Sequence, residues 1–343
     1  MNKLISVALL ATLCISCSTG GLRSDSDAKR PSVLTRETAA ARAKQVQRVS
    51  YHLWFGLDAE REEFDGRTVV QFELRPTASD VSQDILIDFE DGKVTSLALN
   101  GKTIEDPSEH YDGHWIRLKR GELNVSGSNR LEIGFTHPYS TTGNGLHRFK
   151  DPADGRVYLY SNFEPYNAHR MFPCFDQPDI KATYELTVEA PADWQVIANT
   201  RETEITTVAG KKKSWAFPPS PVFSTYIFAL HAGPYSVWKS KQEEIPLRLF
   251  ARRSLSRYVD FNEWLDVTRR GLEFFNVQFG YPYPYGKYDQ IIVPDFNAGA
   301  MENVAAVTFS ERYVPRTRMT QDQRRRRADT SIHTDLSSES SPT

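Results

Sequence analysis

The chain has few cysteines, only three in 343 residues. Cys14 and Cys17 lie in an apolar amino-terminal stretch, which leaves Cys174 alone in the remainder of the chain. An intrachain disulfide within that remainder is excluded, so its core must be held by packing, as a chain of this length allows. An excess of charge of one sign is also lacking, because 42 basic and 44 acidic residues give a net charge of −2. This balance gives no indication of a nucleic-acid partner or of attraction to an anionic membrane surface.

Long apolar runs are absent after residue 17, and no later stretch is long enough to cross a membrane. Residues 4–15 are apolar, follow the positive Lys3 and are too short to span a bilayer, which predicts an export signal over residues 1–17. The Ile-Ser-Cys sequence that ends at Cys17 resembles a bacterial lipoprotein cleavage site. We therefore expect Cys17 to be lipidated and the protein to lie in the cell envelope, with ordinary secretion or a retained anchor as alternatives. Residues 18–47, rich in Ser, Thr, Ala, Lys and Arg, are predicted to be a tether.

Short strands dominate the pattern from residue 48 to residue 242. Apolar and polar residues largely alternate over 68–74, residues 85–89 read as a buried strand, and Asp-Gly and Asn-Gly dipeptides mark turns. Further short strands are predicted at 115–118, 131–135, 157–160, 183–188, 195–198 and 226–230. This spacing predicts an all-β domain of stacked, mostly antiparallel sheets.

The pattern changes to helical spacing in the following segment. Between Phe261 and Phe275, apolar residues recur on one helical face, and Gly280 is a credible helix end. Two strand-like runs then follow at 291–294 and 304–309. Finally, Thr320 with Gln three residues later forms a capping box that predicts the start of another helix.

Five residues connect the two strand-like runs: Gly299, Ala300, Met301, Glu302 and Asn303. A glycine in such a place lets the backbone of another chain come close. The carboxylate of Glu302 can accept charge-assisted hydrogen bonds from a cation such as the α-ammonium group of a peptide. From these five residues alone, an exposed glutamate in a bulge or hairpin remains the alternative.

This pentapeptide, with Tyr-Pro-Tyr-Pro at 281–284 and Phe-Ser-Glu at 309–311, resembles the substrate-binding signature of the aminopeptidase N family of zinc aminopeptidases. Residues 145–183 resemble the segment in which that family's β domain contributes a second glutamate, here Glu164. On charge alone, Glu164 would be a solvated loop residue. The resemblance covers residues 48–330. It implies a multidomain α+β protein in which an all-β domain, 48–242, precedes the incomplete start of a thermolysin-like α/β catalytic domain, 243–330.

The resemblance implies zinc-dependent removal of amino-terminal residues from peptides. Glu302 and Glu164 would hold the free amino terminus, and the backbone around Gly299 and Ala300 would line the peptide's path. An ammonium group offers three donors and no acceptor, so a pocket that fixes it needs more than one carboxylate or carbonyl. Two carboxylates on different domains would also close the pocket behind the amine, so that only the first peptide bond is presented.

The zinc motif of the family is not found in this sequence. Family members carry His-Glu-x-x-His, whereas here His333 stands at the first ligand position, Thr334 replaces the general-base glutamate and Ser337 replaces the second histidine. A catalytic zinc needs three protein ligands and an open position for water. Zinc is thus implied by the family but not expected to be bound by this chain, in which no metal site and no catalytic residue is intact.

The polar, low-complexity residues 331–343 are predicted to be an aberrant tail, and a frameshift or truncated reading frame is our hypothesis for it. Peptides with free amino termini are the expected partners, and a lipid anchor is the only expected membrane contact. The sequence does not fix the oligomeric state. The alternatives to an active aminopeptidase are a catalytically dead peptide-binding or scaffold module and a non-functional truncated product.

Other reactive side chains have simpler interpretations. His169, Arg170 and Asp176 do not have the spacing of a metal site, and no serine elbow accompanies them, so we expect them to stabilise a loop. Cys174 is expected to be a buried structural thiol. The run of arginines at 324–327 spreads around a helix, which favours a solvated face over a nucleic-acid patch.

Overall fold

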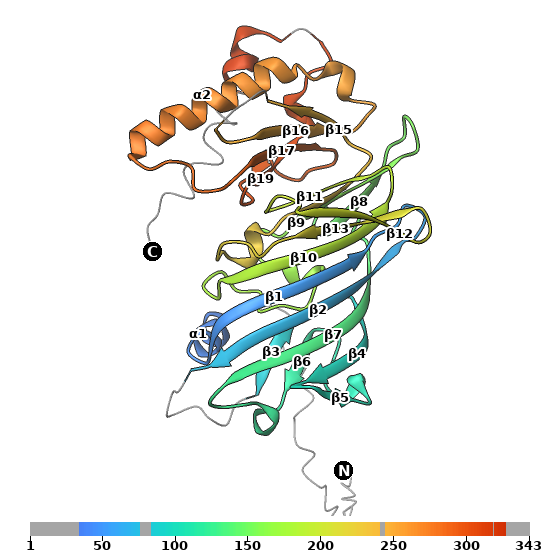
Figure 1. Ribbon diagram of the computed structural model, residues 1–343, viewed down its shortest axis with the longest axis vertical. Coiled ribbons are helices and arrows are strands. Elements are labelled where there is room, and N and C mark those ends of the chain that lie inside the picture. Colours follow the sequence, from blue (N-terminus) through green and yellow to red (C-terminus); the bar gives the residue numbers. More distant parts are fainter. Residues whose placement is uncertain (1–33, 76–83, 241–243, 318, 327–343) are drawn as a thin grey trace, which may run out of the picture. The chain divides into compact units, whose positions relative to one another are not determined.

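The computed structural model describes residues 34–75, 84–240, 244–317 and 319–326, and strands are the commonest regular elements in them (Figure 1). Two longer helices are present in these ranges, α1 (Arg36–Ala43) and α2 (Phe261–Phe279). Neither helix has the length and apolar character needed to cross a bilayer. Two sheets and a strand pair are built from residues before 234, and a further sheet is built from residues after 235.

The largest sheet has eight strands in the order β12-β13-β10-β1-β2-β7-β4-β5. All neighbours are antiparallel except β1 and β10, which run parallel with Val49 opposite Ala182. Burial alternates residue by residue along β7 and β10, because one face of the sheet covers the core. The strands are β1 (Val46–Gly56), β2 (Glu63–Leu74), β4 (Lys93–Leu99), β5 (Lys102–Ile104), β7 (Ser128–Pro138), β10 (Ala182–Pro191), β12 (Glu204–Val208) and β13 (Lys212–Phe217).

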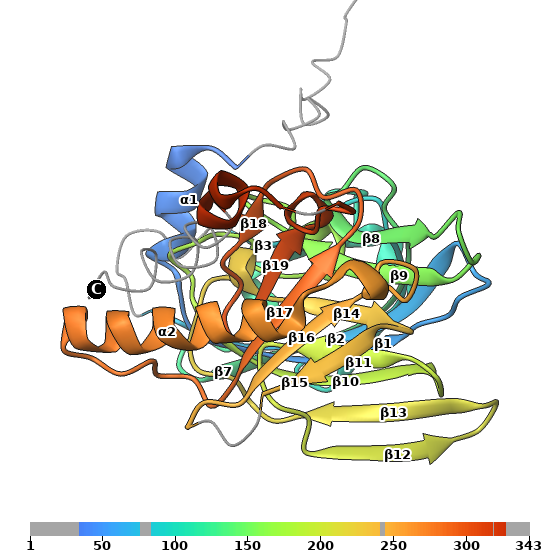
Figure 2. The ribbon, with the colours of Figure 1, turned by 90° about the horizontal axis from the view of Figure 1, so that it is seen from above.

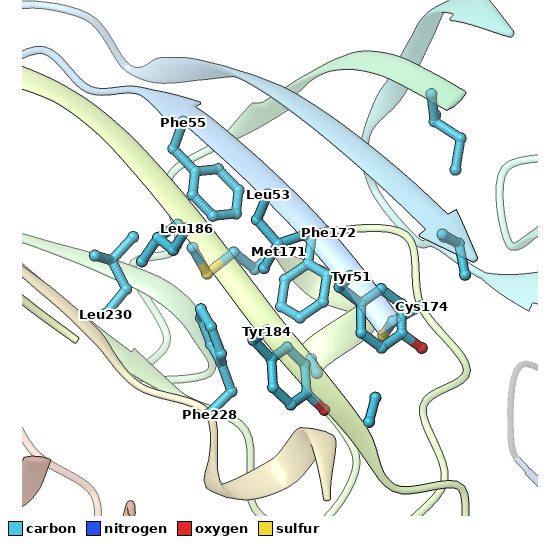
Figure 3. Close-up of a cluster of buried hydrophobic side chains, with 14 of the residues drawn as sticks. Tyr51, Leu53, Phe55, Met171, Phe172, Cys174, Tyr184, Leu186, Phe228 and Leu230 are labelled. Atoms are coloured by element: carbon cyan, nitrogen blue, oxygen red, sulfur yellow. The ribbon is translucent and has the colours of Figure 1, made fainter. Parts of the chain in front are cut away.

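A four-stranded sheet, β11-β14-β9-β8, and the antiparallel pair β3-β6 complete this β-rich part. Aromatic rings fill the core beneath the large sheet; Tyr51 stacks on Tyr184 at 5.3 Å, and Phe172 meets Phe228 at 5.4 Å (Figure 3). The predicted all-β domain is confirmed. Its remaining strands are β3 (Ile85–Asp88), β6 (Trp115–Leu118), β8 (Gly145–Lys150), β9 (Val157–Asn162), β11 (Gln195–Ala198) and β14 (Leu230–Gly233).

The third sheet is mixed, with the order β15-β16-β17-β19-β18. Strands β16, β17 and β19 are parallel and buried along their whole length, and helix α2 lies across the sheet (Figure 2). Trp264 of α2 packs edge-on against Phe309 at 5.5 Å. This is the predicted start of an α/β domain. Its strands are β15 (Ser236–Lys239), β16 (Leu247–Ala251), β17 (Tyr288–Val293), β18 (Ala300–Met301) and β19 (Ala306–Ser310).

The ends of the predicted helices agree with the structure. Asp260 caps α2 by accepting a hydrogen bond from the backbone of Glu263, and Gly280 ends the helix in the left-handed region at φ 64°. The capping box is present, since the Thr320 backbone N–H donates to the Gln323 side chain at 2.9 Å and the return bond is 3.2 Å. A helix follows over 321–326.

The predicted tether contains a short helix, and one predicted strand differs in the structure. Residues 36–43 of the predicted tether form α1, because Arg42 is buried against the Asp88 carboxylate at 2.5 Å and also donates to Gln177. The predicted strand at 226–230 was wrong. A 3-10 turn, η4 (Thr225–Ile227), occupies its first two positions, residues 228 and 229 are irregular, and β14 begins only at Leu230.

Candidate functional site

The strand that carries Ala300 and Met301, β18, is the outermost strand of its sheet. It pairs with β19 alone, Ala300 lying opposite Phe309, and the backbone of Ser310 donates to the Gly299 carbonyl at 2.8 Å. Its other edge has no strand partner among the described residues. An outer strand of this kind can accept an extended peptide by backbone pairing.

Asn303 fixes the turn that follows Glu302. Its buried side-chain amide donates to the Thr308 hydroxyl at 3.1 Å, and the same hydroxyl lies 2.9 Å from Nε2 of the buried His231. The Asn303 carbonyl accepts from the backbone of Ala306 at 3.1 Å. The half-buried Glu302 makes no ion pair with any described residue. Its carboxylate is therefore held in place by the backbone while remaining available to a ligand.

Glu164 lies in the loop after β9 and is exposed, and its bond to Pro165 is cis. Around it the loop is well anchored. Asn167 donates to the Phe163 carbonyl at 2.9 Å, and the Tyr166 hydroxyl donates to the Asp88 carboxylate at 3.2 Å. Within the described residues, the Glu164 carboxylate has no cationic partner.

The turn η4 joins the segments that carry these two glutamates. The Ile227 carbonyl accepts from the backbone of Val304 at 3.3 Å, two residues after Glu302. The ring of Phe228 stacks on Phe163, which precedes Glu164, with centroids 6.2 Å apart. The turn therefore lies between both glutamate-bearing segments.

Tyr226, in the middle of this turn, lies close enough for the charges of both glutamates to act on its hydroxyl. Partial burial, followed by the negative charges of Glu302 and Glu164, raises the pKa of its hydroxyl above the ordinary value of 10. Two carboxylates that have no cationic partner among the described residues and one phenol thus belong to one neighbourhood, which favours a cation. Sequence reasoning missed Tyr226, because its position inside an apparent strand carried no signal of a site.

Buried charges lie beneath this site. The ammonium of Lys287 donates to the carbonyls of Ala198 and Ala305 and to the carboxylate of Asp289, each at 2.7 Å. Arg248 binds the same carboxylate through two nitrogens, at 2.5 and 2.6 Å. Burial lowers the pKa of Lys287 to about 8. The network ties β11 to the turn that follows Asn303.

The predicted loop-stabilising role of His169, Arg170 and Asp176 agrees with the contacts. His169 Nδ1 lies 2.7 Å from the Asp176 carboxylate, and both His169 Nε2 and Arg170 contact Glu90. Cys174 is fully buried, and burial raises the pKa of its thiol well above the usual range, as expected of a structural cysteine. Arg324 pairs with Glu263 at 3.0 Å, consistent with a solvated ion-pairing face.

The protonation of His169 predicts how the free energy of unfolding changes with pH. Burial opposes its protonation, but the hydrogen bond and charge of Asp176, with Asp88 and Glu90, raise its pKa above 6.5. Its contribution to stability is therefore complete below about pH 6.5 and lost as the pH rises through the raised folded-state pKa. We expect the urea unfolding free energy of the wild type to fall more between pH 6 and pH 9 than that of His169→Gln. Parallel pH profiles for the two proteins would contradict this.

Possible metal ligands do not gather in the described part of the chain. No group of three or more His, Cys, Asp or Glu side chains suited to a metal ion occurs within it. His333, the candidate first zinc ligand, and Cys17, the candidate lipidation site, lie outside the described residues. The site that the structure does describe consists of Glu302, Glu164 and Tyr226, and Glu302 directly follows the outer strand β18.

Comparison with known proteins gives two family matches. Residues 47–227 match the Peptidase M1 N-terminal domain, and residues 263–336 match the Peptidase family M1 domain. The chain is 39% identical to aminopeptidase N of Streptomyces lividans over 304 residues, 88% of this chain and 34% of that protein. It is 26% identical to aminopeptidase 2 of Candida albicans over 308 residues, 89% of this chain and 32% of that protein.

Aminopeptidase N of Acetobacter pasteurianus is 27% identical over 272 residues, 78% of this chain and 74% of that protein. The chain spans about a third of the length of the Streptomyces and Candida relatives. The two matched regions correspond to the β-rich part and to the mixed sheet with α2.

Proposed function

The chain belongs to the aminopeptidase N family of M1 metallopeptidases, and from this premise we propose that its site binds the free amino terminus of a peptide. The observation that carries the proposal is that packing at η4 brings the segments of Glu302 and Glu164 together, and that neither carboxylate has a cationic partner among the described residues. Both charges act on the hydroxyl of Tyr226 between these segments. A peptide ammonium group has three N–H donors to place. The two carboxylates accept two of them, and the Tyr226 oxygen is an acceptor within the same site.

The peptide beyond its amine would run along the open edge of β18. An extended chain that pairs with Gly299–Met301 gains backbone hydrogen bonds irrespective of its side chains. Because Gly299 has no side chain, it does not itself cover that edge. The proposed ligand class is therefore peptides with free amino termini, in keeping with the aminopeptidases to which the chain is similar.

Hydrolysis is not part of the function we propose for this chain. In the family, zinc supplies a Lewis acid and an activated water. The donor set at positions 333–337, one histidine with Thr334 and Ser337 in place of the glutamate and second histidine, does not fit a catalytic zinc. We therefore propose a peptide-binding module that does not turn peptides over.

The test compares a fluorescent peptide that has a free amino terminus with its N-acetylated form. Acetylation removes the charge, and we expect it to weaken binding to the full chain about tenfold to a hundredfold. Zinc content and release of chromophore from an aminoacyl nitroanilide are measured on the same sample. Equal affinities would overturn the binding function, and zinc-dependent turnover would overturn the absence of hydrolysis.

We also propose that residues 1–17 direct export and that Cys17 carries the lipid, which would place the site on the cell envelope. The support is the apolar run after Lys3 and the Ile-Ser-Cys sequence. Cells fed a labelled fatty acid are expected to label the wild type and not Cys17→Ser. Equal labelling of both proteins would rule out lipidation at this residue.

A further inference from the structure

Two side chains occupy the space next to the α-carbon of Gly299. A Cβ at this position would lie 2.5 Å from Nη2 of Arg312 and 2.6 Å from the hydroxyl of Tyr313. The guanidinium of Arg312 also lies over the Tyr313 ring, 5.3 Å from its centroid. Because the Cβ of a strand residue points out of the plane of the sheet, a cationic and a phenolic group therefore lie over the face of the sheet at Gly299, next to the outer strand β18.

These two side chains belong to the wall of a cavity of about 220 Å³. The described residues of its lining supply two guanidinium groups, a phenol and an amide, all of which can donate hydrogen bonds, and none of these residues carries a carboxylate. Arg312 makes no ion pair with a described acidic residue. The lining residues are Arg312, Tyr313, Pro315, Met319, Gln323 and Arg326. A cavity with this composition is suited to an anion.

The placement of a peptide beside this cavity rests on the peptide-binding function proposed above. Given that function, strand geometry shows which residue of the bound peptide lies next to the cavity. An extended chain advances about 3.3 Å per residue, and Gly299 precedes Glu302 by three residues, with β18 between them. A peptide held by its amine at Glu302 and running antiparallel to β18 therefore brings its third or fourth residue opposite Gly299. That residue would project toward Arg312.

We propose that this cavity is a carboxylate-binding subsite for the third or fourth residue of a bound peptide. The guanidinium of Arg312 takes the carboxylate in charge-assisted hydrogen bonds, and Arg326 adds positive charge to the same cavity. The carboxylate comes from an acidic side chain or from the free carboxyl end of a very short peptide. The substrate class is thus narrowed from any peptide to peptides that carry a negative charge close to the amino terminus.

The experiment measures binding of labelled hexapeptide amides to the full chain by fluorescence anisotropy. Peptides with Glu at position three or four are compared with the same peptides carrying Gln. We expect Glu to improve affinity about three- to tenfold, since the pair is partly solvated. The preference should fall below about twofold in Arg312→Gln and persist in Arg316→Gln, which removes an exposed arginine outside the cavity lining. Trialanine, which has a free carboxyl end, and trialanine amide, which has none, are compared as competitors. Stronger competition by trialanine shows that the subsite accepts a terminal carboxylate as well as a side-chain carboxylate.

N-acetylated versions of the peptides separate this subsite from the amine site. If acetylation abolishes binding while Glu and Gln peptides bind alike, the subsite is overturned and the amine site stands. If acetylation has no effect, the amine is not held at Glu302, and the peptide register on which the subsite depends is lost. The amine site and the carboxylate subsite are then both overturned. A Glu preference that survives Arg312→Gln also refutes the assignment. Acetylation-sensitive binding by Arg312→Gln shows that this variant is folded.

Discussion

Replacing Glu302 by glutamine is expected to weaken the binding of a peptide with a free amino terminus about tenfold to a hundredfold. Glutamine keeps the length of the side chain and one acceptor oxygen but removes the charge that pairs with the ammonium group. The turn around Glu302 should persist, because Asn303 and Ser310 hold it through bonds that do not involve the Glu302 side chain. The measurement is peptide affinity by anisotropy or calorimetry.

Glu132→Gln is the matched control for this variant. Glu132 lies on β7 and pairs with Arg130. Its replacement by glutamine changes the net charge of the protein by the same amount as Glu302→Gln. The control variant should bind the peptide as the wild type does. Glu164→Gln should weaken binding less than Glu302→Gln, since Glu164 is more exposed and its charge is better screened. Loss of affinity in Glu132→Gln equal to that in Glu302→Gln would mean that overall charge, rather than the site, attracts the peptide.

The second large effect is expected from Asp289→Asn, which should lower the free energy of unfolding by about 3–5 kcal/mol. Although burial opposes ionisation, Lys287 and Arg248 hold the pKa of Asp289 below its ordinary value, so the native carboxylate is charged. Its removal leaves two buried cations facing a neutral amide. Lys287→Met should cost less, because Arg248 still neutralises Asp289 through two hydrogen bonds.

Asp266→Asn provides the comparison for Asp289→Asn. Asp266 also pairs with two arginines, Arg269 and Arg270, but on the exposed face of α2. Solvent screens these pairs, so the unfolding free energy should be nearly unchanged. Urea unfolding of the two variants in parallel checks the prediction. Equal midpoints would show that the buried cluster contributes no more than surface ion pairs.

The elements that could be predicted from the sequence are those whose pattern is set by one buried face. Helix α2 and its end at Gly280 follow from a 3.6-residue period and a glycine. The strand β12 was not predictable in this way, because nearly all of it is exposed and its apolar and polar residues do not alternate. Tertiary contacts also override local pattern at η4, where the Thr225 hydroxyl donates to Asp176 at 2.8 Å.

The members of the site were predicted from motifs, whereas their arrangement was not. Glu302 and Glu164 are separated by 137 intervening positions in the chain, and no local pattern reports that Tyr226 lies between them. Their proximity depends on packing of Phe228 on Phe163 and on the bond from Val304 to Ile227. Such contacts between distant segments are visible only in the folded chain.

One buried amide, Asn199, has a consequence for how tightly this site can bind. Its side chain donates to the carbonyls of Ile227 and Val304, at 3.1 and 2.8 Å, and accepts from the backbone of Ala229 at 2.8 Å. The segments bearing Tyr226 and Glu302 are thus fastened together before any peptide arrives. Preorganisation of this kind removes an entropic cost from association. The affinity of the site for its ligand therefore depends on rigidity established during folding as much as on the charges that touch the ligand.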